Sequence, residues 1–294
     1  FGLFSGAAVF TAQYWGANNL DGVHKMVGID YFVGALFAVI VSLASYVFAP
    51  FIIGVFSSGP EVIEIGSRYL RIVCISYLFG TISMAISYNC RAVQNLKFPT
   101  FISFIAFFMN ASLNYILIFG KFGLPMLGVV GAAIATVTAR IFEFILTITL
   151  ITIKKSPIIC PIAKLNPFSK GLITQFAKTA LPVIVNEFFW GIGTTLYSVA
   201  YGRMGDAAVA AITISTALQD LMVVSFQGIA MATVVILGNE MGANNLKKAK
   251  QYGSYSYIMT FLVGVIASML IMIFRLPFVS LYNVSDNVIN DVKI

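Results

Sequence analysis

Long apolar runs separated by short polar segments make up most of the chain. A helix that crosses about 30 Å of bilayer hydrocarbon needs roughly 20 mainly apolar residues. Two partial runs lie at the ends, one ending near Trp15 and one beginning near Asp286. The runs show no period of two and are far longer than the roughly 9–11 residues of a barrel strand, so the pattern predicts an all-α integral membrane protein. Seven complete runs cover about residues 28–48, 68–90, 100–120, 127–153, 178–202, 207–238 and 254–275.

Proline-containing segments predict where these helices end, because proline lacks a backbone donor and restricts the residue before it. One segment, 154–170, stands apart because it combines four lysines with three prolines, which suits a surface connection between two packed units. We therefore predict an N-terminal lobe at 1–153, a linker at 154–170 and a C-terminal lobe at 171–294. The other breaks are expected at Ala49-Pro50, Ser58-Gly59-Pro60, Lys97-Phe98-Pro99, Gly123-Leu124-Pro125 and Leu276-Pro277.

One stretch of sequence recurs. The segment 13–20 and the segment 239–246 both end in Gly-Ala-Asn-Asn-Leu, with the glycine at 16 in one and at 242 in the other, a displacement of 226 residues. Such self-similarity at a fixed displacement indicates duplication. The same displacement pairs Gly2 with Gly228, Tyr31 with Tyr257, Leu36 with Leu262, Val39 with Val265, Ile40 with Ile266 and Ser42 with Ser268.

The duplication predicts the architecture. The displacement covers six predicted helices, an even number, so both copies enter the membrane in the same direction, as in the parallel repeats of transporters. Extending each copy to the length of the other predicts two six-helix lobes. Because residue 1 is a phenylalanine inside an apolar run, we expect an internal part of a longer protein, covering the second to the start of the tenth of twelve helices.

Composition and charge agree with a membrane protein. The chain is 59% hydrophobic and 10% charged, with a mean hydropathy of +0.93, against roughly 25% charged residues in soluble domains, which excludes a soluble enzyme. Eleven Lys and Arg residues lie in one set of alternate loops and helix ends and six in the other. The positive-inside rule then makes the first set, with the linker 154–170, cytoplasmic. This topology accounts for the net charge of +7 without nucleic acid.

The cysteines, the histidine and the motif search indicate no metal site, disulfide or catalytic site. Cys74, Cys90 and Cys160 are far apart, and His24 is the single histidine, so neither a disulfide framework nor a zinc site is predicted. The chain contains neither HExxH nor GxSxG, the motifs that a membrane-embedded enzyme would need. We expect no enzymatic activity, no metal and no cofactor.

Glu187 is the leading candidate site residue. A charged side chain at the bilayer centre costs on the order of 2.5–3.5 kcal/mol on insertion scales, and Glu187 lies inside the 178–202 run. Trp190 and Thr194 share its helix face at spacings of three and seven. A carboxylate beside an indole is suited to an organic cation, because the ring adds a cation–π surface. The alternative is a protonated glutamate that serves helix packing.

Two further polar groups lie within predicted helices. Asp220 shares a helix face with a polar stripe that includes Gln227, which should line a cavity or the lobe interface; a structural role is equally compatible. Arg140 and Glu143 are three residues apart and are expected to neutralise one another as a structural pair.

Several of these stretches resemble one family, the multidrug and toxic compound extrusion (MATE) transporters. The resemblance implies export of small organic cations in exchange for H⁺ or Na⁺ by two alternating lobes. Many members carry the acid about one turn after Glu187, where this chain has Trp190. The resembling stretches begin at Thr11 (TAQYWGAN), Cys90 (CRAVQNLKFP), Asn110 (NASLN), Gly128 (GVVGAAIAT), Ala180 (ALPV) and Tyr201 (YGRMG).

The resemblance also implies an ion site in the N-terminal lobe. Asn110, Asn114 and Thr136 match positions that take part in that site, together with an acid on a first helix that precedes this chain. Asn114 replaces what is an acid in some members, although amide and hydroxyl oxygens can still bind Na⁺. Helix packing is the alternative for these residues. Glu187 and Asp220 are then the carboxylates left for coupling, which favours H⁺ through the C-terminal lobe.

One alternative transporter remains. A lipid-linked oligosaccharide or polysaccharide flippase would share the lobed architecture, but it would predict a strongly basic cavity, and Arg140 is the only base expected to be buried in a helix interior. The residues therefore favour a monomeric antiporter in the cell membrane.

Overall fold

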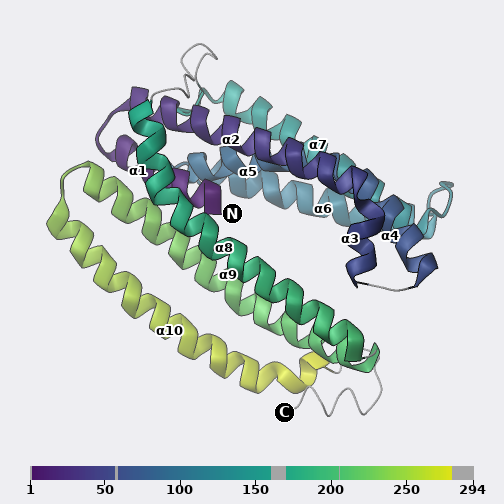
Figure 1. Cartoon of the computed structure of the whole chain (residues 1–294). Helices are drawn as coiled ribbons and strands as arrows, with labels where there is room; N and C mark the ends of the chain where they lie inside the picture. Colours follow the sequence, from purple (N-terminus) through teal and green to yellow (C-terminus); the bar gives the residue numbers. More distant parts are fainter. Residues whose placement is uncertain (1, 57–58, 160–169, 205, 280–294) are drawn as a thin grey trace.

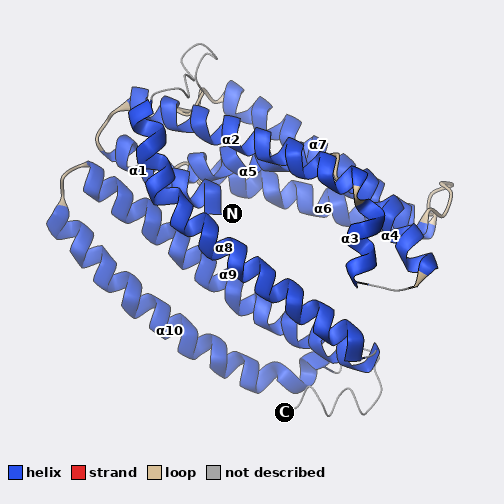
Figure 2. Ribbon diagram, in the orientation of Figure 1, coloured by secondary structure: helices blue, strands red, loops and turns tan. Residues whose placement is uncertain are grey.

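The computed structural model of the chain describes residues 2–56, 59–159, 170–204 and 206–279, and these ranges form helices joined by short turns, with no strand (Figure 2). The predicted start of a further helix near Asp286 and most of the linker 154–170 lie outside the described residues. The helices are α1 (Gly2–Gly16), α2 (Leu20–Val47), α3 (Ala49–Phe56), α4 (Pro60–Val73), α5 (Ser76–Ala92), α6 (Lys97–Phe119), α7 (Gly128–Ile153), α8 (Lys170–Met204), α9 (Asp206–Gly242) and α10 (Leu246–Val279).

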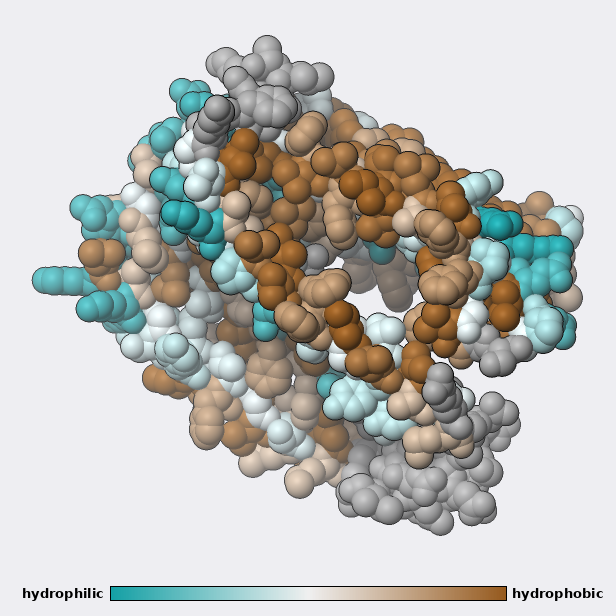
Figure 3. All heavy atoms as spheres, viewed as in Figure 1, coloured by the Kyte–Doolittle hydropathy of each residue, from teal (hydrophilic) through white to brown (hydrophobic). Residues whose placement is uncertain are grey.

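The helices have the length and surface of a multi-pass membrane protein. Among the described residues, α2, α6, α7, α9 and α10 are each long and apolar enough to span a bilayer, and α4 with α5 forms a sixth candidate span. On α6, Phe104 and Phe107 are 63% and 65% exposed. Figure 3 shows apolar residues over the middle of the visible surface and hydrophilic residues gathered at its two ends. This is the distribution that a bilayer requires.

Two groups of helices face each other across α1. In Figure 1, α2, α5, α6 and α7 form one bundle, with α3 and α4 at one end, and α8, α9 and α10 lie side by side. Helix α1 contacts α2 and α5 on one side and α8 and α9 on the other. Its buried residues Ala7, Ala8 and Ala12 are small, and small residues let helix backbones approach closely inside a membrane.

The duplicated sequence forms the same turn twice. Helix α1 ends at Gly16 and α9 at Gly242, and α2 and α10 begin four residues later. In both turns the second residue after the glycine is an asparagine with a left-handed backbone, Asn18 at φ 54° and Asn244 at φ 60°. Asparagine tolerates this region better than most residues because its short side chain bonds locally. The backbone amides of Asn19 and Asn245 each bond a carbonyl oxygen five residues back, at 2.8 Å in both turns.

The two copies also cross each other reciprocally. A Cβ atom built on Gly16 would overlap the carbonyl oxygen of Asn239, and one built on Gly242 would overlap the carbonyl oxygen of Gln13. Gln13 and Asn239 are themselves 226 residues apart. A contact that maps onto itself when the copies are exchanged is the property of an isologous, two-fold interface. The arrangement supports the predicted duplication.

Several predicted helix ends differ from the structure. The 68–90 run is two helices, α4 and α5, bent by 49° at residues 74–75, because the Ser76 hydroxyl and the cysteine thiol of this corner bond nearby carbonyls. The chain after Ala49-Pro50 continues as α3, since proline is tolerated in a first helical turn, and α10 runs two residues past Pro277. The 178–202 run forms α8 but is not among the candidate spans, so its crossing of the bilayer stays a prediction.

Candidate functional site

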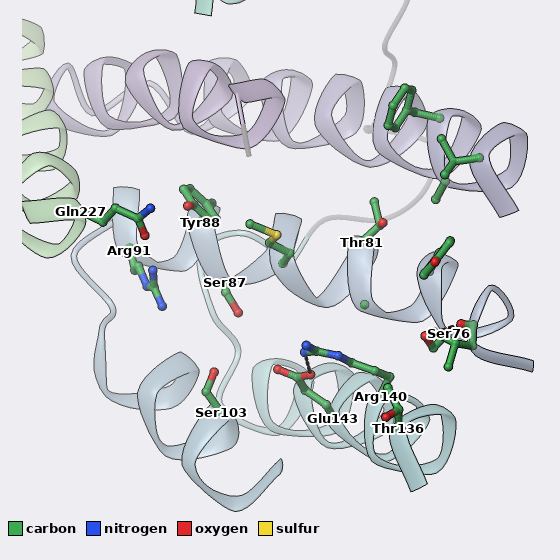
Figure 4. Close-up of a pocket in the computed structure, with 17 residues that line it drawn as sticks. Ser76, Thr81, Ser87, Tyr88, Arg91, Ser103, Thr136, Arg140, Glu143 and Gln227 are labelled. Atoms are coloured by element: carbon green, nitrogen blue, oxygen red, sulfur yellow. Dashed lines mark hydrogen bonds and ion pairs between the residues drawn. The ribbon is translucent and has the colours of Figure 1, made fainter. Parts of the chain in front are cut away.

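A large cavity lies against the first group of helices. Its volume is about 740 Å³, and residues from α2, α5 and α7 form most of its wall. Figure 4 shows that the side chains of Tyr88 and Arg91 come from one side and those of Thr136, Arg140 and Glu143 from the opposite side. Gln227 of α9 also reaches the wall. The cavity therefore has lining residues from both copies of the repeat.

The charged residues of this wall are partly paired. Arg140 Nη1 donates to Glu143 Oε2 at 2.7 Å, with the arginine side chain 53% exposed and the glutamate side chain 10% exposed. The predicted pairing is confirmed, but its place in a cavity wall was not predicted. The Arg91 guanidinium lies 5.7 Å from the ring centroid of Tyr88, within cation–π range. The wall thus combines apolar side chains with polar, charged and aromatic ones.

A smaller cavity of about 290 Å³ shares Arg140 and Glu143 with the larger one. Of the ion-site residues predicted in the N-terminal lobe, Asn110 and Thr136 line it. Asn114 Nδ2 donates to Asn110 Oδ1 at 2.9 Å, and the Thr136 hydroxyl donates to its own helix at Ala132 O. The side-chain oxygens of Asn110 on α6 and Thr136 on α7 thus lie on the same cavity. That they bind an ion stays a prediction.

The predicted site residues of α8 lie outside both cavities. Glu187 is half-buried and packs against α1, since a Cβ atom built on Gly2 would lie 3.2 Å from its Cγ. Phe4, half a turn further along α1, packs against the Tyr88 ring on the cavity wall at 6.2 Å between centroids. Trp190 is 63% exposed, and the exposed Thr194 hydroxyl donates to its own helix at Gly191 O. Their part in substrate binding stays a prediction.

The polar stripe of α9 reaches the cavity at one residue. Gln227 lines the large cavity, which agrees with the expectation that this stripe faces a cavity or the other lobe. Asp220 is exposed and does not line either cavity described above. A role for Asp220 in binding stays a prediction.

The sequence reasoning missed one buried carboxyl, Asp30. It is fully buried, as are Asn89 and Thr11. Asn89 Nδ2 donates to Asp30 Oδ2 at 2.7 Å, and the Thr11 hydroxyl donates to Asn89 Oδ1 at 2.8 Å. The second oxygen of Asp30, Oδ1, has no hydrogen-bond partner in the described part of the chain.

Asp30 was missed because the predicted helix began too late. A start at residue 28 places Asp30 at a helix end, whereas α2 begins at Leu20 and Asp30 is its eleventh residue. The signal was present in the sequence. Asn19 caps the helix, with its side-chain oxygen accepting from the backbone amide of Gly22 at 2.9 Å, and asparagine is a preferred residue at this position. The expectation that Glu187 and Asp220 are the carboxylates left for coupling therefore overlooked the buried carboxyl of Asp30.

Membrane-spanning helices, a duplicated hairpin and a cavity lined from both copies define a multi-pass membrane protein with the architecture of a transporter. The family model described as MatE matches residues 1–116 and 182–294. The chain therefore belongs to the MatE family, the multidrug and toxic compound extrusion transporters, which confirms the resemblance. Because the family consists of transporters, this assignment decides against the membrane-embedded enzyme.

Similar proteins agree with the family. The chain is 22% identical over 283 residues to the probable multidrug resistance protein YoeA of Bacillus subtilis, covering 96% of the chain and 61% of that protein. It is 24% identical over 220 residues to the probable multidrug resistance protein NorM of Neisseria meningitidis serogroup B, covering 74% of the chain and 48% of that protein. The chain thus spans between about half and three fifths of the length of these curated relatives.

A solved structure shares the fold. The outward-facing conformation of a multidrug resistance MATE family transporter of the MOP superfamily matches with a TM-score of 0.87 at 19% identity, covering 99% of this chain and 64% of that one. At this identity the likeness concerns the fold, which is the predicted all-α membrane architecture.

Proposed function

We propose that the whole protein exports small organic cations in exchange for H⁺ or Na⁺, by alternating access of two lobes with boundaries near 1–153 and 171–294. The observation that carries the proposal is the 740 Å³ cavity with Gln227 of α9 in a wall built mainly by α2, α5 and α7. Its size is within the range of small-molecule sites. A ligand there contacts both copies of the repeat, so their relative movement changes its surroundings.

An aromatic ring on the cavity wall and a carboxyl on the neighbouring helix α8 support a cationic substrate. Tyr88 offers an aromatic face, and the Glu187 carboxyl lies beside the start of α1, where Phe4 packs against the Tyr88 ring. Aromatic faces and carboxylates together recognise organic cations. We infer that the cation binds against Tyr88, with Glu187 supplying charge from α8 and with Trp190, Thr194 and Asp220 on the path toward the C-terminal lobe.

The flippase alternative is less well supported. It calls for several unpaired bases in the cavity, to hold a pyrophosphate. The large cavity has two arginines, of which Arg140 is paired with Glu143. Arg91 alone is left to provide basic charge, and it lies over the Tyr88 ring at the end of α5.

Orientation belongs to the same proposal. The linker 154–170 and the helix starts that follow the two Gly-Ala-Asn-Asn-Leu turns carry eight of the twelve lysines. This distribution favours the cytoplasmic side of the cell membrane for these segments. Labelling of single cysteines introduced at Asn18 and at Phe122, on opposite sides of the predicted membrane, tests it in intact cells. An impermeant maleimide should reach position 122 and not position 18.

The function is tested with Glu187→Gln in the full-length protein. Export of ethidium from cells should fall by about tenfold, equivalent to about 1.4 kcal/mol of lost interaction, because shape is kept and charge is removed. Glu64→Gln is the matched control, since Glu64 is 66% exposed and pairs with Arg68 on α4. Equal export by the Glu187→Gln variant and the parent, at equal protein levels, would show that Glu187 serves packing only.

A further inference from the structure

The Asp30 carboxyl is a buried acid without a counter-ion. Neither of the two ion pairs among the described residues includes it. It accepts one hydrogen bond, from Asn89, whose amide group also donates to Ala85 O. A single hydrogen bond to one oxygen is less than a buried carboxylate needs, since an unpaired charge in the interior is strongly unfavourable. Something else must neutralise the Asp30 charge.

The geometry around the Asp30 carboxyl suits the binding of a proton better than the binding of a metal ion. Asn89 Oδ1 is occupied by the Thr11 hydroxyl, and Asp30 Oδ2 by the Asn89 amide. One oxygen, Asp30 Oδ1, is then unpaired, whereas Na⁺ needs several oxygen ligands. Asp30 is fully buried, and neither cavity described above is lined by it. A proton bound to Asp30 Oδ1 neutralises the carboxylate and needs no additional space around it.

The duplicated position shows that the hairpin does not require this acid. Asp30 corresponds to Ser256 in the second copy, 226 residues later. Ser256 is half-buried and accepts a hydrogen bond from the Thr233 hydroxyl at 3.0 Å. Since a serine suffices in the same hairpin of α9 and α10, packing of the turn does not explain a carboxyl at position 30.

The network also involves a helix that contacts both copies of the repeat. Thr11 lies on α1, which contacts α8 and α9 of the second copy. Asn89 follows Tyr88, whose side chain lines the large cavity. A displacement of α1 away from α5 would break the bond between the Thr11 hydroxyl and Asn89 and would expose the buried Asp30 carboxyl to water. The position of α1, the protonation state of Asp30 and the shape of the cavity wall are therefore linked.

We propose that Asp30 is a proton-carrying site of the transport cycle. While Thr11 and Asn89 enclose it, the carboxyl is neutral. When α1 moves away, the Oδ1–H bond breaks, the proton passes to water and a carboxylate remains. The titratable groups nearby are Tyr31 on α2, Tyr88 and Cys90 on α5, and Glu187 beyond Tyr88 on α8; α1 faces Asp30 through the neutral Thr11. The proposal rests on the proposed antiport and names a residue for its proton.

The first experiment labels the unaltered full-length protein in membranes with dicyclohexylcarbodiimide, which reacts with protonated carboxyls in apolar surroundings. Mass spectrometry measures the modified fraction at Asp30. The fraction should fall as pH rises, and ethidium should change it at constant pH, because substrate shifts α1. A fraction indifferent to ethidium would overturn the proposal, and protection by Na⁺ at constant pH would assign the site to Na⁺ instead.

The second experiment compares Asp30→Asn with Ser256→Ala in proteoliposomes of the full-length protein. Asp30→Asn should still exchange ethidium for ethidium but lose uptake driven by a pH gradient. Ser256→Ala should keep both. Uptake by Asp30→Asn equal to the parent overturns the role of Asp30. If the parent itself transports under neither a pH nor a Na⁺ gradient, the proposed antiport fails instead. Should Asp30→Asn not fold, Asp30→Glu replaces it, and the labelling result decides.

Discussion

The hairpin of α1 and α2 and the hairpin of α9 and α10 share a backbone and differ in their interior. Their turns have the same hydrogen bonds and the same left-handed asparagine. Inside, the first hairpin holds Asp30 in a network with Thr11 and Asn89, whereas the second has a single bond between Thr233 and Ser256. The two hairpins thus share the contact between α1 and α9 at Gly16 and Gly242. They differ in the polar side chains that are buried between their helices.

This difference separates two requirements. The crossing places Gly16 and Gly242 against backbone of the opposite copy, so neither copy can change there alone without a clash. The side chains at positions 30 and 256 bond residues of their own lobe. A substitution at one of these positions therefore does not require a matching change at the other. Symmetry is thus expected at the crossing and asymmetry away from it.

The largest expected effect comes from the crossing glycines. Gly16→Ala and Gly242→Ala should each lower stability by about 1–3 kcal/mol, the usual cost of overpacking, because the new methyl group overlaps a carbonyl oxygen. Thermal unfolding of the purified full-length variants measures this. Gly253→Ala is the control, since nothing lies within 4 Å of a Cβ atom there. Clearly unequal losses in the two variants would break the symmetry of the crossing.

Loss of a hydrogen bond should lower stability more in the Thr11–Asn89–Asp30 network than in the Thr233–Ser256 pair. Thr11→Val leaves Asn89 Oδ1 without its donor in a fully buried site, so its cost should approach the upper end, about 1.7 kcal/mol, of interhelical hydrogen bonds in membranes. Thr233→Val at a half-buried site should cost about 0.6 kcal/mol, the average of such bonds. Unfolding in a denaturing detergent gives both values. Equal costs would argue that the two interiors are equivalent.

The last comparison concerns the turn asparagines. Asn18→Ala and Asn244→Ala should each cost about 1 kcal/mol, because alanine is strained in the left-handed region, while glycine at either position should be nearly neutral. Melting temperatures of the four variants test this. A loss on Asn18→Gly matching that of Asn18→Ala would mean that the side chain, and not the backbone, matters.

Parts of this molecule follow from the sequence alone. The apolar runs located α2, α6, α7, α9 and α10, because a span of hydrocarbon demands a long apolar segment whatever packs against it. The recurring Gly-Ala-Asn-Asn-Leu segment predicted a duplication whose two turns have the same hydrogen bonds. The Arg140–Glu143 pair was also predictable, since residues three apart on a helix are neighbours.

Tertiary structure alone decided the candidate site. Asp30 and Asn89 are 59 residues apart, and Thr11 and Asn89 are 78 residues apart, so no helical spacing relates them. The same holds for Gln227 of α9, which meets α5 and α7 across the large cavity. Periodicity tells which residues share a face of one helix, but which faces meet depends on how closely small residues such as Ala12 and Gly238 let the helices approach.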